Sequence, residues 1–243
     1  HILCSMASVI RLYVDHPLGV GQSVPLNREQ SHYLFGVMRR SVGEVLELFN
    51  GHDGEWLARV VQAGKRNAIL LCESKSKPMM LPPDLWMMFA PIKKARTDFI
   101  VEKATEMGAA QILPVQTDFT NSERIRQDRL QNHAVEAAEQ CGGTYVPPVM
   151  ELQKLSKLLD GWDERHIMFC DENRLGQAVA LSQQPGPWAI LIGPEGGFSP
   201  AERERLEAMP QAQGVSLGPR ILRADTAAVA ALALWQTSLG DWQ

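Results

Sequence analysis

The chain has 243 residues, of which 45% are hydrophobic and 21% charged, a composition typical of a globular protein with one large core or two modest ones. The formal net charge of −4 does not by itself indicate a nucleic-acid binder. The apolar stretches are too short to cross a membrane, and the four cysteines lack the spacing of a zinc site or a disulfide framework. We therefore expect a cytoplasmic protein that binds no metal.

The first part of the chain resembles a set of short strands joined by turns. Met6 is the expected natural start, so the fold prediction leaves out residues 1–5. One helix interrupts the strands, because Asn27 and Gln30 form a predicted capping box and apolar residues recur after it at helical spacing. Strands are expected at residues 11–14, 23–26, 44–50, 54–61 and 68–74. This pattern predicts a small β-barrel domain over residues 9–75.

A segment rich in proline and lysine, residues 74–84, predicts a linker, and we place the domain boundary between residues 75 and 76. After it, apolar runs alternate with amphipathic helices. Strands are expected at residues 85–92, 110–116, 166–172, 188–194 and 214–219, and helices at residues 96–108 and 128–143. Strands separated by helices of this length pair in parallel, so residues 76–243 are predicted to form an α/β domain.

The stretch "LIGPEGGFSPAERE", residues 191–204, places one proline and three glycines between a buried strand and a helix. Ser199 and Glu202 form a predicted capping box, with Pro200 at the first helical position. Loops at the carboxyl ends of parallel strands are where open α/β sheets bind ligands. The alternative is a tight turn whose glycines serve only to allow positive φ.

A second stretch of this kind, "VSLGPRILRADTAA", again joins a strand to a helix through a Gly-Pro turn, and Asp225 or Thr226 marks the expected helix start. Two such bends at strand ends are expected to line one crevice. Neither bend matches the dinucleotide-binding or P-loop glycine pattern, so those two kinds of nucleotide site are poorly supported.

Five segments of the chain together resemble the 16S ribosomal RNA uridine N3-methyltransferase family of the SPOUT class. They occur in family order within residues 11–236, at residues 32–51, 93–117, 134–143, 192–204 and 217–227. Two positions depart from the family pattern. The chain has Thr117-Asp118-Phe119 where the family commonly has Thr-Glu-Arg, and Asp225 where the family usually has glutamate.

The resemblance implies a PUA-like β-barrel domain followed by a SPOUT α/β domain with a trefoil knot, assembled as a homodimer. It also implies S-adenosylmethionine as cofactor and a uridine near the 3′ end of 16S rRNA, in the small ribosomal subunit, as substrate. The implied cofactor-binding residues lie on the two bends: Gly193, Glu195, Gly197, Leu217, Gly218, Ile221 and Leu222. Phe169 and Cys170 are expected to form a third wall.

Three residues are candidates for the chemistry. Arg223 is expected to stabilise charge that develops on the uridine oxygens, and Asp225 or Glu195 to orient N3 or accept its proton. The alternatives are a helix N-cap for Asp225 and a carboxylate that binds its own backbone for Glu195.

The RNA-binding candidates are basic side chains from both domains: Arg11, His32, Arg39, Arg40, Lys94, Arg96, Arg124 and Arg126. The alternative for each cation is a solvated surface charge, and for His32 a packed core histidine.

Besides a phosphate-binding hydrolase that would use the glycine-rich loops, two other functions stay open at this level. The first is a methyltransferase of the same fold that acts on another rRNA or tRNA base. The second is a non-catalytic RNA-binding factor in ribosome assembly, which would not bind S-adenosylmethionine.

Overall fold

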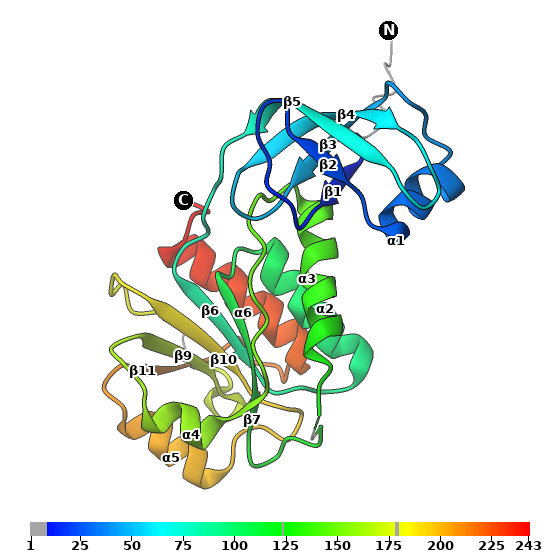
Figure 1. The fold of residues 1–243 in the computed structure, drawn as a ribbon. Helices are drawn as coiled ribbons and strands as arrows, with labels where there is room; N and C mark the ends of the chain where they lie inside the picture. The colour runs from blue at the N-terminus through cyan, green and yellow to red at the C-terminus, as the bar shows by residue number, and fades with distance from the viewer. Residues whose placement is uncertain (1–8, 123, 178–179) are drawn as a thin grey trace, which may run out of the picture. The chain divides into compact units, whose positions relative to one another are not determined.

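The computed structural model of the chain describes residues 9–122, 124–177 and 180–243, so the expected start at Met6 lies outside the described residues. The chain divides into two compact units (Figure 1). Unit 1 comprises residues 9–81 together with Ala138–Tyr145, and unit 2 comprises Pro82–Ala137 and Val146–Gln243. The sequence pattern gives no signal for the inclusion of Ala138–Tyr145 in unit 1, because this grouping depends on long-range contacts.

Unit 1 is built on a five-stranded mixed sheet with the strand order β1-β3-β4-β5-β2. β1 and β3 pair in parallel, and the other neighbours are antiparallel. All five predicted strands are confirmed: β1 (Arg11–Tyr13), β2 (Ser23–Pro25), β3 (Val45–Phe49), β4 (Glu55–Gln62) and β5 (Ile69–Lys77). The linker prediction is wrong for residues 74–77, because β5 continues through them and Lys77 pairs with Glu55 of β4.

The predicted helix of unit 1 is confirmed, with an irregular continuation. Asn27 Oδ1 accepts a hydrogen bond from the Gln30 backbone N–H at 2.8 Å, which completes the predicted capping box of α1 (Arg28–Ser31). A π-helix, His32–Val37, follows directly. Leu34 is buried in the core of unit 1, whereas His32 is exposed, so the core-histidine alternative is wrong.

Unit 2 is built on a six-stranded sheet, entirely parallel, with the strand order β11-β9-β10-β6-β7-β8. Its strands are β6 (Leu85–Phe89), β7 (Gln111–Gln116), β8 (Gln153–Lys154), β9 (His166–Cys170), β10 (Trp188–Ile192) and β11 (Ala212–Val215). Every residue of β10 is buried, as expected of an apolar central strand with both faces covered. β8 was not predicted, because two residues carry no periodic signal, and β11 begins and ends earlier than the strand predicted at residues 214–219.

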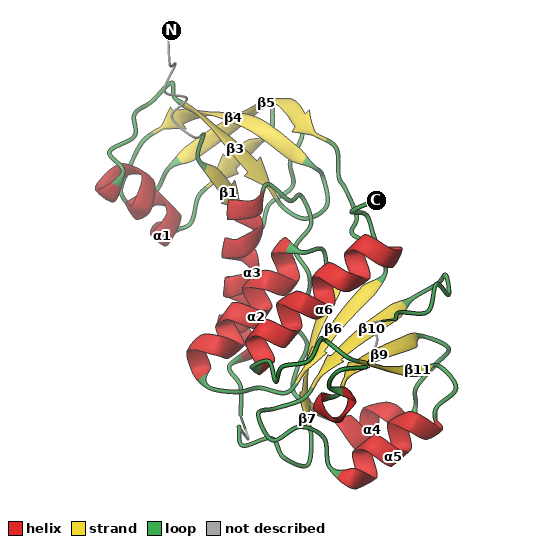
Figure 2. Cartoon of the chain, turned by 180° about the vertical axis from the view of Figure 1, so that it is seen from behind, coloured by secondary structure: helices red, strands yellow, loops and turns green. Residues whose placement is uncertain are grey.

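Helices cover both faces of this sheet (Figure 2). One face packs against α2 (Lys94–Glu106), α3 (Gln127–Cys141) and α6 (Ala224–Leu239), and the other against α4 (Leu155–Asp160) and α5 (Pro200–Ala208). Ile100, Leu232 and Met87 belong to the core on the first face, and Leu206 and Leu191 belong to the core on the second. The predicted α/β domain is therefore confirmed. The trefoil knot stays a prediction.

Among the described helices, none combines the length and the apolar character that a membrane crossing requires.

Candidate active site

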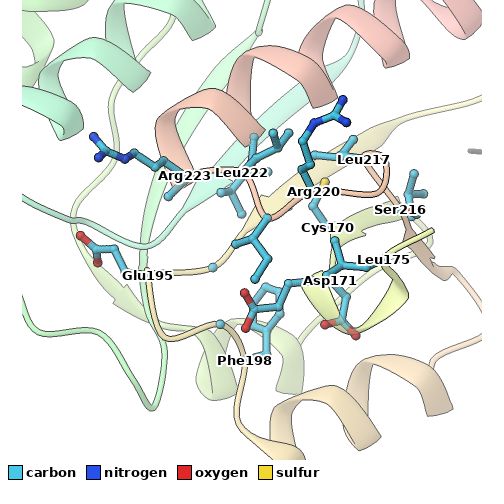
Figure 3. A pocket seen from close by; sticks show the side chains of 18 of the residues that line it. Cys170, Asp171, Leu175, Glu195, Phe198, Ser216, Leu217, Arg220, Leu222 and Arg223 are labelled. Atoms are coloured by element: carbon cyan, nitrogen blue, oxygen red, sulfur yellow. The ribbon is translucent and has the colours of Figure 1, made fainter. Parts of the chain in front are cut away.

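A pocket opens at the carboxyl edge of three adjacent strands in unit 2 (Figure 3). Because β9, β10 and β11 run in parallel, the loops that follow them leave the sheet at the same edge. These three loops form the walls of the pocket, and the first turn of α6 closes it with Ala224 and Ala227.

The first wall is the bend after β10. Gly197 has φ +70°, a conformation that favours glycine, and its N–H donates to the Pro194 carbonyl at 2.9 Å. A Cβ at Gly193 would lie 3.3 Å from the ring of the buried Phe198, so the loop folds closely over that ring. The predicted capping box of α5 is confirmed, with the Ser199 N–H donating to Glu202 Oε2 at 2.9 Å.

The second wall is the bend after β11. Gly218 has φ +107°, and a Cβ there would meet no other atom within 4 Å, so the bend faces open space. The following helix, α6, begins at Ala224 with Arg223 in the N-cap position, so the predicted start at Asp225 or Thr226 is one or two residues late. Asp225 lies in the first helical turn, and the N-cap alternative for it is wrong.

The third wall follows β9, where the sequence placed Phe169 and Cys170. Cys170 lines the pocket, whereas Phe169 is fully buried and packs edge-to-face against Phe198. Burial raises the pKa of the Cys170 thiol to about 12, so the thiol stays protonated at neutral pH and is a poor nucleophile.

A buried ion pair ties the third wall to the first. Asp171 has a side chain only 3% exposed, and its Oδ2 accepts a hydrogen bond from Arg203 Nε at 3.0 Å. Arg203 Nη2 also donates to the Phe198 carbonyl at 3.2 Å. Sequence reasoning missed both residues. The available signal was the acidic pair Asp171-Glu172, which directly follows a buried strand.

The structure brings all seven predicted cofactor-binding residues together. They come from two segments about twenty positions apart in the chain. All of them line the same pocket: Gly193, Glu195, Gly197, Leu217, Gly218, Ile221 and Leu222. Arg223 lines it as well, whereas Asp225 does not and instead lies 3.9 Å from Arg96 Nε on α2. The lining also includes residues that were not predicted, among them Glu172, Leu175 and Arg220.

Glu195 and Arg223 lie toward the same side of the pocket, away from the side where Leu175, Ser216 and Leu217 lie (Figure 3). We call this side the pocket mouth. Both side chains are exposed, and within the described part of the chain neither has a hydrogen bond or an ion pair. An acceptor and a cation are therefore both available to a ligand at the mouth.

The predicted RNA-binding residues of unit 2 lie on two segments beyond the same edge of the sheet. Lys94 and Arg96 lie in the first turn of α2, which follows β6, and Arg124 and Arg126 lie in the loop that follows β7. Ser122 Oγ donates to the Ile92 carbonyl at 3.4 Å, which joins the two segments. Arg126 pairs with Asp128, and both side chains are well exposed, so this pair leaves the arginine accessible.

Three of the predicted RNA-binding residues of unit 1 lie in and just after the π-helix. His32 begins this helix, and Arg39 follows it with φ 53°, a left-handed conformation that few residues other than glycine adopt. Arg40 is half-buried and lies 3.7 Å from Glu44. His32 and Arg39 are exposed and accessible to a ligand.

Arg11 differs from these residues, because the fold uses its guanidinium. The side chain is 10% exposed, and its Nε donates to the fully buried Glu55 carboxylate at 2.7 Å. Its Nη atoms donate to the carbonyls of Ala138, Glu139 and Gly143. We therefore correct the sequence-based role for Arg11: it is a buried structural cation, and it is not part of the proposed phosphate contact.

Within the described ranges, no group of three or more His, Cys, Asp or Glu side chains is placed to hold a metal ion.

A small mixed-sheet unit joined to a parallel α/β unit, with two glycine bends lining one pocket at the carboxyl edge, is the arrangement that the resemblance to the SPOUT class of RNA methyltransferases predicts. The comparisons with known proteins agree. A sequence model described as an RNA methyltransferase domain matches residues 79–236, and one described as an RNA methyltransferase PUA domain matches residues 26–71.

Individual relatives cover almost the whole chain. The ribosomal RNA small subunit methyltransferase E of Rickettsia conorii is 31% identical over 92% of this chain and 93% of its own length. The crystal structure of the enzyme of that name from Neisseria gonorrhoeae, bound to S-adenosylmethionine, is 29% identical with a TM-score of 0.86 and covers 97% of this chain and 100% of its own. A Legionella pneumophila methyltransferase in complex with the same cofactor is 28% identical, also with a TM-score of 0.86, over 96% and 99% of the two chains. The chain belongs to the RNA methyltransferase family represented by ribosomal RNA small subunit methyltransferase E.

Proposed function

We propose that this protein is an S-adenosylmethionine-dependent rRNA methyltransferase that methylates N3 of a uridine near the 3′ end of 16S rRNA. The observation that carries the proposal is the pocket itself. Two glycine bends line it, and Glu195 and Arg223 stand at its mouth without a partner among the described residues. The structure of the Neisseria gonorrhoeae relative, which covers 97% of this chain, is bound to S-adenosylmethionine.

The residues of the pocket fit such a cofactor. Apolar side chains, including Leu175, Leu217 and Leu222, can enclose an adenine ring, and the open space at Gly218 lets main-chain groups approach it. Glu172 Oε1 lies 3.1 Å from the position of a Cβ on Gly197, which places a carboxylate beside the first bend. A carboxylate at this position can accept hydrogen bonds from sugar hydroxyls and favours a bound cation.

When bound, S-adenosylmethionine supplies a methyl group already activated by its sulfonium, so the protein must position the base and manage one proton. Uridine N3 loses its proton as it attacks, and negative charge spreads onto O2 and O4. We assign proton acceptance to Glu195 and charge stabilisation to Arg223, since both lie at the mouth. Asp225 is the less favoured acceptor, because it does not line the pocket and lies beside Arg96.

Exposed cations supply the contact with the RNA backbone. In unit 2 these basic side chains are Lys94, Arg124 and Arg126, together with the partly exposed Arg96, and in unit 1 they are His32 and Arg39, together with the half-buried Arg40. Such contacts orient the nucleic acid without reading its sequence, and the target base must leave its stack to expose N3.

The proposal includes a cytoplasmic homodimer, as the family resemblance implies. Light scattering would then give twice the 27.0 kDa mass of one chain.

The test combines a deletion strain with the purified protein. We expect 16S rRNA from the deletion strain to lack 3-methyluridine, measured by mass spectrometry of its nucleosides. The purified protein should restore this nucleoside in small subunits from that strain when S-adenosylmethionine is added. Loss of a different methylated nucleoside, or calorimetry without any heat from S-adenosylmethionine binding, would contradict the proposal.

A further inference from the structure

An exposed aromatic side chain lies beside the cofactor loop and has no role in the site described so far. Phe119 belongs to the short turn Thr117–Thr120 after β7, and 46% of its surface is accessible. A single exposed apolar side chain is common on protein surfaces and needs a further reason before it indicates function.

The first reason is that the turn is fixed. The Thr120 N–H donates to the Thr117 carbonyl at 3.2 Å, and the Thr117 N–H donates to Thr120 Oγ1 at 2.9 Å. The turn is also attached to the start of α5, because the Asp118 N–H donates to Glu202 Oε1 at 2.8 Å and Ser199 Oγ donates to the Asp118 carboxylate. Phe119 therefore projects from an ordered backbone, so a base that binds to its ring does not also have to order the main chain of the turn.

The second reason is its position next to the pocket mouth. The Cβ of Phe119 is 3.4 Å from the place that a Cβ on Gly196 would occupy. Gly196 is the residue between Glu195 and Gly197, both of which line the pocket. The ring is therefore one residue away from the carboxylate that we assign to proton acceptance.

The third reason is that the ring has a free face. The other exposed phenylalanine of unit 2, Phe99 on α2, has Lys103 Nζ 5.4 Å from its ring centroid, so a cation of its own helix covers it. Within the described part of the chain, no aromatic ring or cation stacks on Phe119.

We propose that Phe119 is a substrate-binding residue on which the unstacked uridine, or the base next to it, stacks while N3 points into the pocket. This inference rests on the proposed function, because it requires an RNA acceptor. A base that leaves its helical stack loses stacking energy, and an aromatic ring at the binding site replaces part of that energy. Stacking of a base on the Phe119 ring needs no positive charge. It therefore contributes to RNA binding even though this position departs from the arginine that the family pattern commonly has.

The experiment measures methyl transfer to small subunits that lack the modification, with Phe119→Ala, Phe119→Leu and Phe119→Trp. We expect Phe119→Ala to lower kcat/KM for the RNA by about 5- to 160-fold, the range that corresponds to the loss of about 1–3 kcal/mol for a base-stacking aromatic on alanine substitution. Phe119→Leu keeps an apolar side chain but has no aromatic ring, so its kcat/KM should fall about as much as that of Phe119→Ala. Phe119→Trp should stay within about threefold of the wild type. The matched control Phe99→Ala should leave kcat/KM unchanged.

Calorimetry with S-adenosylmethionine separates a role in RNA binding from a role in shaping the loop, since the Kd for the cofactor should be the same in all variants. Full rescue by leucine, wild-type kcat/KM in Phe119→Ala, or a loss confined to cofactor affinity would each overturn the assignment of Phe119. A wild-type protein that transfers no methyl group to 16S rRNA would instead overturn the proposed function on which the inference rests.

Discussion

At the scale of single residues, Arg223 is the sharpest test of the proposed chemistry. Arg223 lies at the pocket mouth (Figure 3), and in the proposed mechanism its charge acts mainly as negative charge develops on the uridine oxygens. We expect Arg223→Ala to lower kcat by about 100-fold, the effect of removing one such donor in other enzymes, and to change the cofactor Kd by less than about threefold. Single-turnover methylation and calorimetry measure the two quantities.

The variant Arg223→Lys is the matched comparison, because it keeps the positive charge and should recover part of the lost rate. Equal losses of rate and of cofactor affinity in Arg223→Ala would show that Arg223 binds the cofactor and does not act in the transition state.

Arg11 is the residue whose role changed most between sequence and structure, and its new role is also testable. Burial raises the pKa of Glu55, but hydrogen bonds from Ser76 and Arg11 and the nearby positive charges outweigh this effect, so the pKa of Glu55 is lowered overall. A carboxyl with a lowered folded-state pKa stabilises the fold above its ordinary pKa of 4.5, and this stabilisation is lost as the pH falls through the folded-state value.

We expect Arg11→Ala to lower the free energy of unfolding of unit 1 by about 3 kcal/mol at pH 7, because it leaves the Glu55 carboxylate buried without its main partner. The difference from the wild type should shrink below pH 4.5, where protonation removes the unpaired charge. Hydrogen exchange of the β3 and β4 amides measures both effects. Arg59→Ala, which removes an exposed pair with Glu73, is the control and should change nothing. An Arg11 variant with normal stability but weak RNA binding would restore the sequence-based role.

At the scale of elements, the pocket depends on a connection between the loop after β9 and the loop after β10. Arg203 on α5 makes this connection through Asp171 and the Phe198 carbonyl. We expect Arg203→Ala to raise the Kd for S-adenosylmethionine by about 10-fold, since hydrogen bonds to charged groups contribute about 1.5–3 kcal/mol and part of that energy holds the walls together. Calorimetry measures this effect.

Arg205→Ala is the matched control, two residues away on the same helix, where an exposed pair with Asp160 does not touch the pocket. Similar cofactor affinities in the two variants would show that the connection through Arg203 does not shape the site.

The elements also show which features a sequence can predict. The capping boxes at Asn27 and Ser199 were predictable, because each depends on two residues only three positions apart in the sequence. The seven expected cofactor-binding residues came from the family resemblance, and the structure shows that they line one pocket, as expected for two bends at neighbouring strand ends. The pairing of Asp171 with Arg203 was not predictable, because it joins positions 32 residues apart. The extension of β5 to Lys77 was missed because its charged, exposed residues resemble a linker, although pairing with β4 keeps them in the sheet.

At the scale of the whole molecule, a chain with a net charge of −4 must bind a polyanion, so the contact has to come from local groups of cations.

The salt dependence of RNA binding tests which cations make this contact. Each phosphate that a cation neutralises steepens, by about 0.7, the fall of the logarithm of the association constant with the logarithm of the salt concentration for single-stranded nucleic acid. If Arg124 and Arg126 each contact one phosphate, the double variant Arg124→Gln with Arg126→Gln should reduce this slope by about 1.4 and leave cofactor binding unchanged. Filter binding of a 16S rRNA 3′ fragment over a salt series measures the slope. Arg124 and Arg126 would be excluded from the phosphate contact if the double variant kept the wild-type slope, because cations that neutralise no phosphate release no counterions.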